Sequence, residues 1–424
     1  MKNVIKGIIL ENQRADLPDV ISRDLQIPLH LGVIVSLIGA RRSGKTYMLY
    51  DCMKKLQREG ISREKMLFMN FEDERLNIHT EDLDLILQAY SELYPDISLG
   101  EVFFFFDEIQ NVPGWEKFVR RVFDTKSRGI FVSGSNSRLL STEIATSLRG
   151  RSISFSVYPL SLREYLRFHQ VPSNIDIQKT RSAVIHYTGK FLREGGFPEL
   201  VFFDETNRRR IIQQYFNVMM LRDLVERYSI SNIGALRFFV KKIFAGVGKP
   251  FSVHKAFNDL KSLGYKVSNK YLYEFFSQSN DIFLCQTINR YHPSEIKQEK
   301  SDKKAYIIDN GMLSAIEFSV SKNEGKLFEN MVALEFLKAG KEIMYFKQTY
   351  ECDFVVKDNL TLSPVQVCFD LHDGETRQRE IRGLVECCHA LDVTRGTIIT
   401  FDQEESFEQN GVQVDVVAVW RWFL

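Results

Sequence analysis

Residues 39–46 read Gly39-Ala40-Arg41-Arg42-Ser43-Gly44-Lys45-Thr46, which fits the phosphate-loop pattern GxxxxGK(S/T). An apolar run over 32–38 precedes the loop, and apolar residues at helical spacing follow it over 49–56. The motif therefore lies between a predicted buried strand and the N-terminus of a predicted helix. Backbone N–H groups of such a loop surround phosphates, and the positive end of the helix dipole favours their charge. The alternative is a chance match in a strand-to-helix turn, and the flanking pattern argues against it.

The loop residues predict ATP and Mg²⁺ as cofactors. Lys45 is expected to reach the β- and γ-phosphates, and the Thr46 hydroxyl is expected to bind Mg²⁺. The rest of the loop is expected to contact the phosphates, mainly through its backbone: Gly39, Ala40, Arg41, Arg42, Ser43 and Gly44.

Four consecutive phenylalanines at 103–106 lead into Asp107 and Glu108. Such a run is typical of a strand buried on both faces of a parallel sheet. The two carboxylates come at the C-terminal end of that strand, where open α/β sheets bind ligands. Asp107 fits a residue that holds Mg²⁺, directly or through water, and Glu108 fits a general base for the attacking water. The alternative is a charged strand end that turns to solvent.

Two further pairs of residues are candidates for the same site. Ser135 and Asn136 follow an apolar run over 129–134, and either contact the γ-phosphate or the attacking water, or cap the next helix. Arg149 and Arg151 precede a predicted strand over 152–157. Either arginine is a candidate to stabilise the transition state, in its own chain or from a neighbouring subunit, and a solvated basic turn is the alternative. The sequence leaves open whether the protein forms a homo-oligomer.

Composition bounds the class of protein. The chain has 424 residues, of which 44% are hydrophobic and 26% charged, as expected for a soluble protein with several domains. Its net charge of +1 neither indicates nor excludes a nucleic-acid partner. The six cysteines form no CxxC pair, and no run approaches the roughly 18 apolar residues of a membrane span. With no signal-peptide pattern at the N-terminus, we expect a cytoplasmic protein without a membrane partner.

The order of predicted elements divides the chain into four domains. Residues 1–160 alternate strands and helices, which predicts a doubly wound α/β core. Residues 161–230 are mostly helical and are interpreted as a lid over the nucleotide. Residues 231–315 show helix, helix, turn, helix and a hydrophobic hairpin, which favours a winged helix-turn-helix. Residues 316–424 form a further α/β segment without a phosphate loop.

The winged-helix segment carries a basic excess. Residues 231–310 contain 13 Lys/Arg and seven Asp/Glu, a net charge of +6. Its third helix would present Lys266, Asn269, Lys270 and Tyr273 to double-stranded DNA. A winged helix that binds another domain or a protein is the alternative.

Together these motifs resemble the prokaryotic AAA-type ATPases related to the MCM and STAND groups. The resemblance rests on the following stretches: the phosphate loop, Asp107-Glu108-Ile109-Gln110, Gly134-Ser135-Asn136, Leu148-Arg149-Gly150-Arg151, Pro159-Leu160-Ser161, Gly195-Gly196-Phe197-Pro198 and Tyr306-Ile307-Ile308-Asp309-Asn310-Gly311. It implies a P-loop AAA-type ATPase followed by a winged helix and a restriction-endonuclease-like C-terminal domain of unknown function.

The C-terminal segment departs from the endonuclease pattern that the resemblance implies. Glu329 and Asp353 match its helical Glu and strand Asp, but its Glu-x-Lys is replaced by Gln366-Val367-Cys368. Gln is a weaker ligand than Glu for a hard cation, and Cys provides no positive charge beside a scissile phosphate. We therefore expect a degenerate domain that binds a partner, unless a basic side chain from the 377–382 helix substitutes.

Three functions follow from these features. The favoured one is an ATPase that couples nucleotide state to recognition of DNA or a protein partner, the latter through the C-terminal domain. The second is a nucleotide-dependent regulatory switch with negligible turnover, against which the Asp107-Glu108 pair argues. The third, an ATP-powered metal-dependent DNA nuclease, is disfavoured by Gln366 and Cys368.

Overall fold

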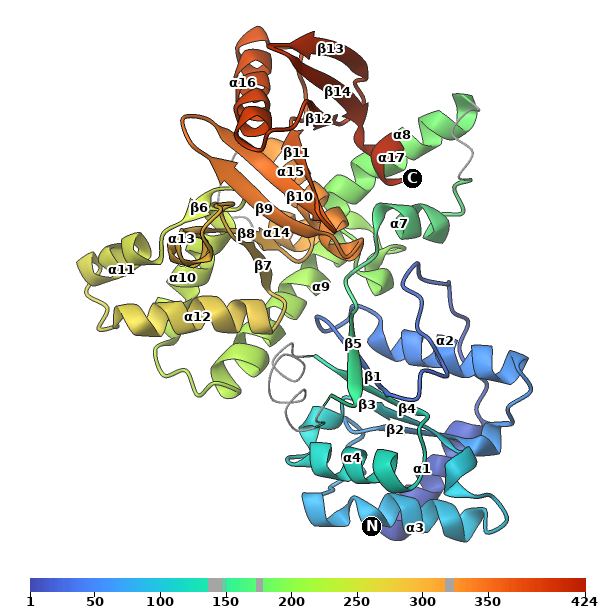
Figure 1. Ribbon diagram of the computed structural model, residues 1–424. Coiled ribbons are helices and arrows are strands. Elements are labelled where there is room, and N and C mark those ends of the chain that lie inside the picture. The colour runs from blue at the N-terminus through green and yellow to red at the C-terminus, as the bar shows by residue number, and fades with distance from the viewer. Residues whose placement is uncertain (136–147, 149, 173–177, 317–323) are drawn as a thin grey trace. The chain divides into compact units, whose positions relative to one another are not determined.

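The computed structural model describes residues 1–135, 148, 150–172, 178–316 and 324–424. The chain divides into two compact units, unit 1 over Met1–Tyr158 and unit 2 over Pro159–Leu424 (Figure 1). The predicted ATPase core corresponds to unit 1, and the three segments predicted as separate domains after it all fall in unit 2. Two predicted site residues, Asn136 and Arg149, lie outside the described residues.

Unit 1 is built around a parallel sheet. Its five strands have the order β2-β3-β4-β1-β5, and every pair is parallel. The elements in chain order are α1 (Lys2–Arg14), β1 (Ile34–Ile38), α2 (Lys45–Arg58), β2 (Met66–Asn70), α3 (Asp84–Leu93), β3 (Phe103–Asp107), α4 (Trp115–Thr125), β4 (Ile130–Gly134) and β5 (Ser152–Ser156). The α/β core expected for residues 1–160 is present.

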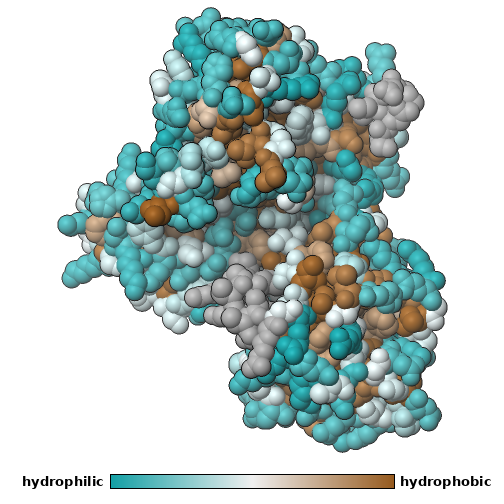
Figure 2. All heavy atoms as spheres, in the orientation of Figure 1, coloured by the Kyte–Doolittle hydropathy of each residue, from teal (hydrophilic) through white to brown (hydrophobic). Residues whose placement is uncertain are grey.

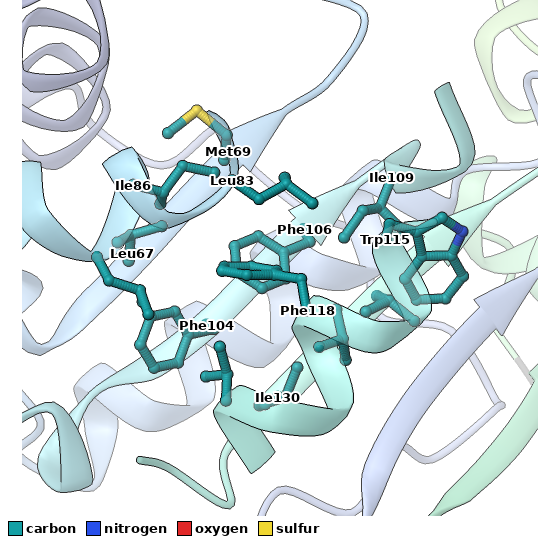
Figure 3. Packing of buried hydrophobic residues seen from close by; sticks show 14 of the residues in the cluster. Leu67, Met69, Leu83, Ile86, Phe104, Phe106, Ile109, Trp115, Phe118 and Ile130 are labelled. Atoms are coloured by element: carbon teal, nitrogen blue, oxygen red, sulfur yellow. The ribbon is translucent and has the colours of Figure 1, made fainter. Parts of the chain in front are cut away.

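The phenylalanine run of β3 is buried on both faces of this sheet. Because side chains alternate along a strand, Phe104 and Phe106 point to the side covered by α1, α3 and α4, where they pack with Leu67 and Trp115 (Figure 3). Phe105 points to the other side and stacks on Phe131, at 4.8 Å between ring centroids. The strand is therefore fixed from both sides, and so is the position of the carboxylates that follow it.

Unit 2 begins with helices. These are α7 (Leu162–Phe168), α8 (Gln178–Glu194), α9 (Glu205–Val218), a π-helix (Met219–Glu226), α10 (Ile233–Ala245), α11 (Val253–Ser262) and α12 (Asn269–Asp281). Residues 161–230 are predicted to be mostly helical, and a π-helix is not part of that prediction. Over only eight residues the apolar spacing also suits an α-helix, so the pattern does not indicate that the hydrogen bonds shift to i→i+5.

Two sheets complete unit 2. A three-stranded antiparallel sheet has the order β6-β8-β7, formed by β6 (Pro250–Phe251), β7 (Cys285–Ile288) and β8 (Lys303–Ile307). A six-stranded mixed sheet has the order β13-β14-β12-β11-β10-β9. Its strands are β9 (Glu342–Lys347), β10 (Glu351–Asp358), β11 (Thr361–Val367), β12 (Arg395–Thr400), β13 (Glu405–Gln409) and β14 (Val412–Ala418), and the remaining helices are α13 (Glu295–Lys300), α14 (Asn310–Ile316), α15 (Glu324–Lys338), α16 (Gly374–Ala390) and α17 (Val419–Phe423).

The two sheets of unit 2 are joined through their backbones. The Tyr345 N–H donates to the Asn289 carbonyl at 3.0 Å, and the Tyr291 N–H donates to the Tyr345 carbonyl at 2.7 Å. The segment that follows β7 therefore runs beside β9 as a short parallel bridge. These bonds hold the predicted winged-helix segment against the C-terminal segment.

A buried lysine connects the same two segments through its charge. Lys304 of β8 is 0% exposed. Its Nζ lies 3.2 Å from Glu329 Oε1, 2.9 Å from Glu351 Oε1 and 3.2 Å from Asp353 Oδ1. The Tyr306 hydroxyl also donates to Glu329 Oε1, at 2.8 Å. We call Lys304, Tyr306, Glu329, Glu351 and Asp353 the Lys304 cluster.

The charges in the Lys304 cluster depend on one another. Burial disfavours the charged form of Lys304, but Glu329 and the neighbouring acidic groups outweigh burial and hold the pKa of Lys304 well above its ordinary value. Burial and the charge of Asp353 raise the pKa of Glu329 to about 7. Removing one partner from such a group leaves an uncompensated buried charge.

Among the described residues, no helix is long and apolar enough to span a membrane. On the face drawn in Figure 2, hydrophilic residues cover most of the surface of both units, with apolar residues scattered between them.

We expect Lys304→Met to lower the free energy of unfolding of unit 2 by about 3–5 kcal/mol, because the carboxylates would lose their counter-ion. Urea dependence of hydrogen–deuterium exchange in β8 and β10 measures this loss. The matched control is Lys303→Met, since Lys303 is the preceding residue and its Nζ lies 3.4 Å from the exposed Glu299 carboxylate; its loss should stay below about 1 kcal/mol. Adding Glu329→Gln to Lys304→Met should restore part of the stability. Equal losses in both single variants would contradict the role assigned to Lys304.

Candidate nucleotide site

The loop after β1 has the backbone form that anion binding requires. Gly44 adopts φ 100° and caps α2, which begins at Lys45. Arg42 also has a positive φ, of 64°. Loop residues with positive φ turn neighbouring N–H groups toward one side of the loop, next to the positive end of α2. The local sequence therefore builds a concave group of donors at the edge of the sheet.

Gly39 is required by close packing at the start of the loop. A Cβ on Gly39 would lie 1.9 Å from the carbonyl oxygen of Val157, which follows β5. The Val157 N–H in turn donates to the Ile38 carbonyl at 2.5 Å. The loop thus rests directly on the backbone at the end of unit 1.

Lys45 is buried at the centre of the site and is 4% exposed. Its Nζ donates to the carbonyls of Gly39 at 3.2 Å and Ala40 at 3.1 Å. The same ammonium lies 3.3 Å from Glu108 Oε1. The structure therefore brings together the predicted phosphate-binding lysine and the predicted general base.

Asp107 joins the loop to the sheet. The Thr46 hydroxyl donates to Asp107 Oδ2 at 2.8 Å, and the Ser133 hydroxyl of β4 donates to Asp107 Oδ1. Burial, with the charge of Glu108 second, raises the pKa of Asp107 to about 6. The two predicted metal-holding residues are thus adjacent, and both offer the oxygen atoms that Mg²⁺ prefers.

Glu108 is held in an unusual backbone conformation. Its φ is 51°, and its N–H donates to the Ser133 hydroxyl at 3.0 Å. Burial acts to raise the pKa of Glu108, but the Lys45 ammonium and the Gln110 amide outweigh it, so the pKa is lowered and the carboxylate stays ionised. Gln110 Nε2 donates to Glu108 Oε2. Positive φ at a bulky residue is a strain that occurs mainly at functional sites.

Two buried serine hydroxyls face no protein partner. Within the described part of the chain, Ser43 Oγ of the loop and Ser135 Oγ after β4 accept and donate no hydrogen bond. Buried polar atoms are nearly always satisfied, so these orphaned hydroxyls fit a site that receives a polar ligand such as a phosphate. This agrees with ATP and Mg²⁺ as the groups that the site would hold.

The predicted arginines have different surroundings. Arg151 Nε lies 2.7 Å from Asp124 Oδ1 in an ion pair that is partly exposed. Arg41 Nη1 donates to Glu72 Oε1 at 2.9 Å. Arg149 and Asn136, as noted, lie outside the described residues.

Three residues of this site were not predicted from the sequence. Ser133 and Gln110 contact the two carboxylates, and Arg23 contacts the loop, where its guanidinium donates to the Ser43 carbonyl at 3.1 Å and the Tyr158 carbonyl at 2.8 Å. The position of Ser133 at a strand end next to β3 is a signal that was present. Arg23 gives no such signal, because it lies in a segment without regular structure.

The endonuclease-like residues form a different arrangement. Glu329 and Asp353 do come together, but around Lys304. Gln366 Oε1 accepts from the Asp353 N–H at 3.1 Å and its amide donates to Glu380, and Cys368 Sγ contacts the Asp370 carbonyl at 3.1 Å. Among the described residues, no group of three His, Cys, Asp or Glu has the geometry to hold a metal ion.

That a basic residue of the 377–382 helix substitutes for the missing lysine stays a prediction. Arg377 pairs with Glu405 and Arg379 pairs with Glu380. A further positive charge, that of Lys304 of β8, lies beside Glu329 and Asp353.

Two sequence stretches quoted for the resemblance also meet. The Gly196 N–H donates to Asp309 Oδ2 at 2.6 Å, and Asp309 Oδ1 accepts from the Met312 N–H at 3.1 Å. Gly195, at φ 77°, packs against the same carboxylate. Because both oxygens of the Asp309 carboxylate accept hydrogen bonds from backbone N–H groups, the contact between Gly196 and Asp309 joins two segments of unit 2.

Two parts of the chain match family models of known proteins. Residues 32–166 match the family model of an AAA domain, and residues 188–323 match a domain of unknown function, DUF8612. Two solved structures cover 78% of the chain: the Cdc6p protein of Pyrobaculum aerophilum (11% identity, TM-score 0.26, 93% of that chain) and the Aeropyrum pernix Orc1 protein in complex with DNA (12%, 0.30, 92%). At these TM-scores the likeness does not bear on the function of this chain.

Two curated relatives match over most of their length. An uncharacterized protein of Haemophilus influenzae is 29% identical over 90% of this chain and 92% of its own. The uncharacterized protein MJ1544 of Methanocaldococcus jannaschii is 34% identical over 100% of this chain and 96% of its own. The chain therefore belongs to the family of MJ1544, and it carries an AAA domain over residues 32–166.

Proposed function

We propose that the protein binds ATP with Mg²⁺ at residues 39–46 and hydrolyses it. The observation that carries the proposal is the convergence of Lys45, Thr46, Asp107 and Glu108 at one buried edge of the sheet, with Thr46 and Asp107 2.8 Å apart and Lys45 and Glu108 3.3 Å apart. Thr46 and Asp107 are the residues that would hold Mg²⁺. The ion would neutralise charge on the phosphate oxygens.

The side chains then have separate tasks. The Lys45 ammonium would move from Glu108 to the β- and γ-phosphate oxygens. Glu108 would then be able to orient the attacking water and accept its proton. Gln110 would hold Glu108 in position from its other oxygen. Ser135 and Asn136 are proposed to contact the γ-phosphate or the water. Arg149 or Arg151 is proposed to stabilise the transition state, and for Arg151 this role requires that it leave Asp124.

A nucleotide-dependent switch with negligible turnover is the second candidate. The contact of Glu108 with both Lys45 and Gln110 favours it, because a base held on two sides does not approach water unless it is released. Turnover measurements separate the two candidates.

The proposed role of ATP is to couple nucleotide state to recognition of a partner by unit 2. We propose double-stranded DNA as the partner of the winged-helix segment, with α12 as the helix that faces it. Lys270 and Tyr273 are exposed on α12, and Lys266 is exposed in the turn before it. A protein partner of the C-terminal segment is the remaining proposal, and the Lys304 cluster disfavours nuclease activity.

We expect Glu108→Gln to lower kcat for ATP hydrolysis by about 100-fold or more while ATP binding survives, because the general base is lost. Lys45→Ala should abolish both, since the phosphates lose their main cation. Phosphate release and binding of a fluorescent ATP analogue measure these effects. Glu101→Gln and Lys54→Ala, on the surface of the same unit, are the controls. Wild-type turnover in Glu108→Gln would refute the assigned base, and a wild-type protein that binds ATP without turnover would establish the switch.

We expect Gly39→Ala to weaken ATP binding by about tenfold or more, because the new Cβ would overlap the Val157 carbonyl and displace the loop. Gly100→Ala is the control, since its Cβ would meet its nearest atom at 3.5 Å. Titration with the fluorescent ATP analogue measures both variants. Unchanged affinity in Gly39→Ala would show that the loop tolerates the shift and that its packing on Val157 is not required.

We expect Lys266→Gln and Lys270→Gln each to weaken binding of double-stranded DNA uniformly across sequences and to lower the salt slope by about 1, as loss of one phosphate contact does. Fluorescence anisotropy at several salt concentrations measures this. Lys179→Gln, on α8, is the control. If the control changes the slope as much as the α12 variants, DNA contact by α12 is wrong.

A further inference from the structure

A cavity lies in unit 2, within the matched domain of unknown function. It has a volume of about 460 Å³ and opens between α9, the π-helix, α10 and the residue before Lys266. We call it the α10 pocket, and the side chains that matter for its chemistry are Phe216, Met220, Arg237, Phe238, Lys241 and Tyr265. Ligand sites in proteins typically have volumes of about 300–1,000 Å³, so the α10 pocket has room for a small molecule or one unit of a polymer.

Aromatic rings form most of the apolar wall of the pocket. Phe216 is fixed by an edge-to-face contact with buried Phe244, at 5.5 Å between centroids. Phe238 and Tyr265 are half-buried and come from different segments. Met220 adds a flexible thioether that adapts to aromatic surfaces. Such a wall favours a flat, polarisable group over a branched aliphatic one.

Two cations line the same cavity. Arg237 and Lys241 are four residues apart on α10, so their side chains lie on one side of that helix, and both are exposed. Among the described residues, neither Asp nor Glu contributes to the lining. The pocket therefore complements a ligand that carries negative charge beside an aromatic ring.

The backbone around the pocket is also unusual. The wall next to α9 is a π-helix of eight residues, Met219–Glu226, whereas π-helices are mostly single turns that occur at functional sites. On the opposite side, a Cβ on Gly234 would lie 2.9 Å from Cε1 of Tyr265. The absence of a side chain at Gly234 thus sets the position of the Tyr265 ring.

We propose that the α10 pocket binds a nucleotide unit, with the base against the aromatic wall and the phosphate on Arg237 and Lys241. Every base has a π-face, and stacking on aromatic side chains beside cations is how proteins bind unpaired nucleotides. A simple anion would not use the rings, and an apolar ligand would gain nothing from the positive charges of Arg237 and Lys241. The bound nucleotide is either part of a single-stranded nucleic acid or a free nucleotide. The proposal does not depend on hydrolysis at residues 39–46.

Binding of two probes to the full-length protein tests the proposal. The first is a fluorescent ten-residue oligodeoxythymidylate followed by anisotropy, and the second is thymidine monophosphate as a competitor. Tyr265→Leu and Arg237→Gln should each weaken oligonucleotide binding about tenfold. Tyr350→Leu, which changes an exposed ring between β9 and β10, and Lys255→Gln, which removes an exposed charge on α11, are the matched controls and should leave binding within about twofold.

Gly234→Ala tests whether the position of the Tyr265 ring matters when the ring itself is kept. Alanine suits a helix better than glycine, so α10 should not be weakened, yet the Tyr265 ring must move. We expect about the same loss of binding as in Tyr265→Leu. Wild-type binding in Tyr265→Leu, Arg237→Gln and Gly234→Ala would overturn the proposal.

The competitors identify the source and the chemistry of the ligand. Displacement by thymidine monophosphate assigns the pocket to free nucleotides, and displacement only by oligonucleotides assigns it to single strands; both outcomes support the proposal. Octyl phosphate carries the charge without the ring, and equal displacement by it would refute recognition of a base. Lys45→Ala should bind both probes as the wild type does, so failure of the ATPase proposal would not affect this result.

Discussion

The register of the parallel strands β1, β4 and β3 is the constraint on which the nucleotide site depends. In this register Ile38 pairs with Gly134, and Phe106 pairs with Val132. The loop after β1 and the carboxylates after β3 therefore reach the same edge, with the Ser133 hydroxyl between them. A slip of one residue in β3 would turn Asp107 to the other face of the sheet. Identical phenylalanines on both faces do not by themselves prevent such a slip, and the hydrogen bonds that Asp107 accepts from Thr46 and Ser133 are what distinguish this register.

The sequence predicts a feature well when the residues that form it lie close together along the chain, and poorly when they lie far apart. Lys45 and Thr46 lie within one loop, and Asp107 follows its strand directly, so local patterns predict their roles. Lys304 lies 25 residues from Glu329 and 49 from Asp353, and its contacts depend on how two sheets pack. Arg23 is similar, since its partners are carbonyls at positions 43 and 158. The π-helix was not predicted for another reason: its apolar residues also fit the spacing of an α-helix.

The two lysine–carboxylate groups of the chain differ in how their charges are compensated. Each ammonium has three N–H donors. In Lys304 all three face carboxylates, from α15 and β10, and the side chain is fully buried. In Lys45 two donors face the neutral carbonyls of Gly39 and Ala40, and only one faces a carboxylate. Hydrogen bonds to charged acceptors are roughly twice as strong as neutral ones, so the two lysines are held with unequal strength.

This difference decides which lysine is able to exchange partners. The proposed triphosphate would bring several anionic oxygens to Lys45 and replace carbonyl contacts with stronger ones, so the ammonium would gain by moving. For Lys304, any incoming anion would have to displace carboxylates that already satisfy every donor, and would leave Glu329 and Asp353 buried without a counter-ion. The residues that resemble a nuclease site are therefore stabilised as a closed group that joins two segments of unit 2. Of the two lysine–carboxylate groups, the one at residues 39–46 is therefore the one whose lysine is able to exchange partners.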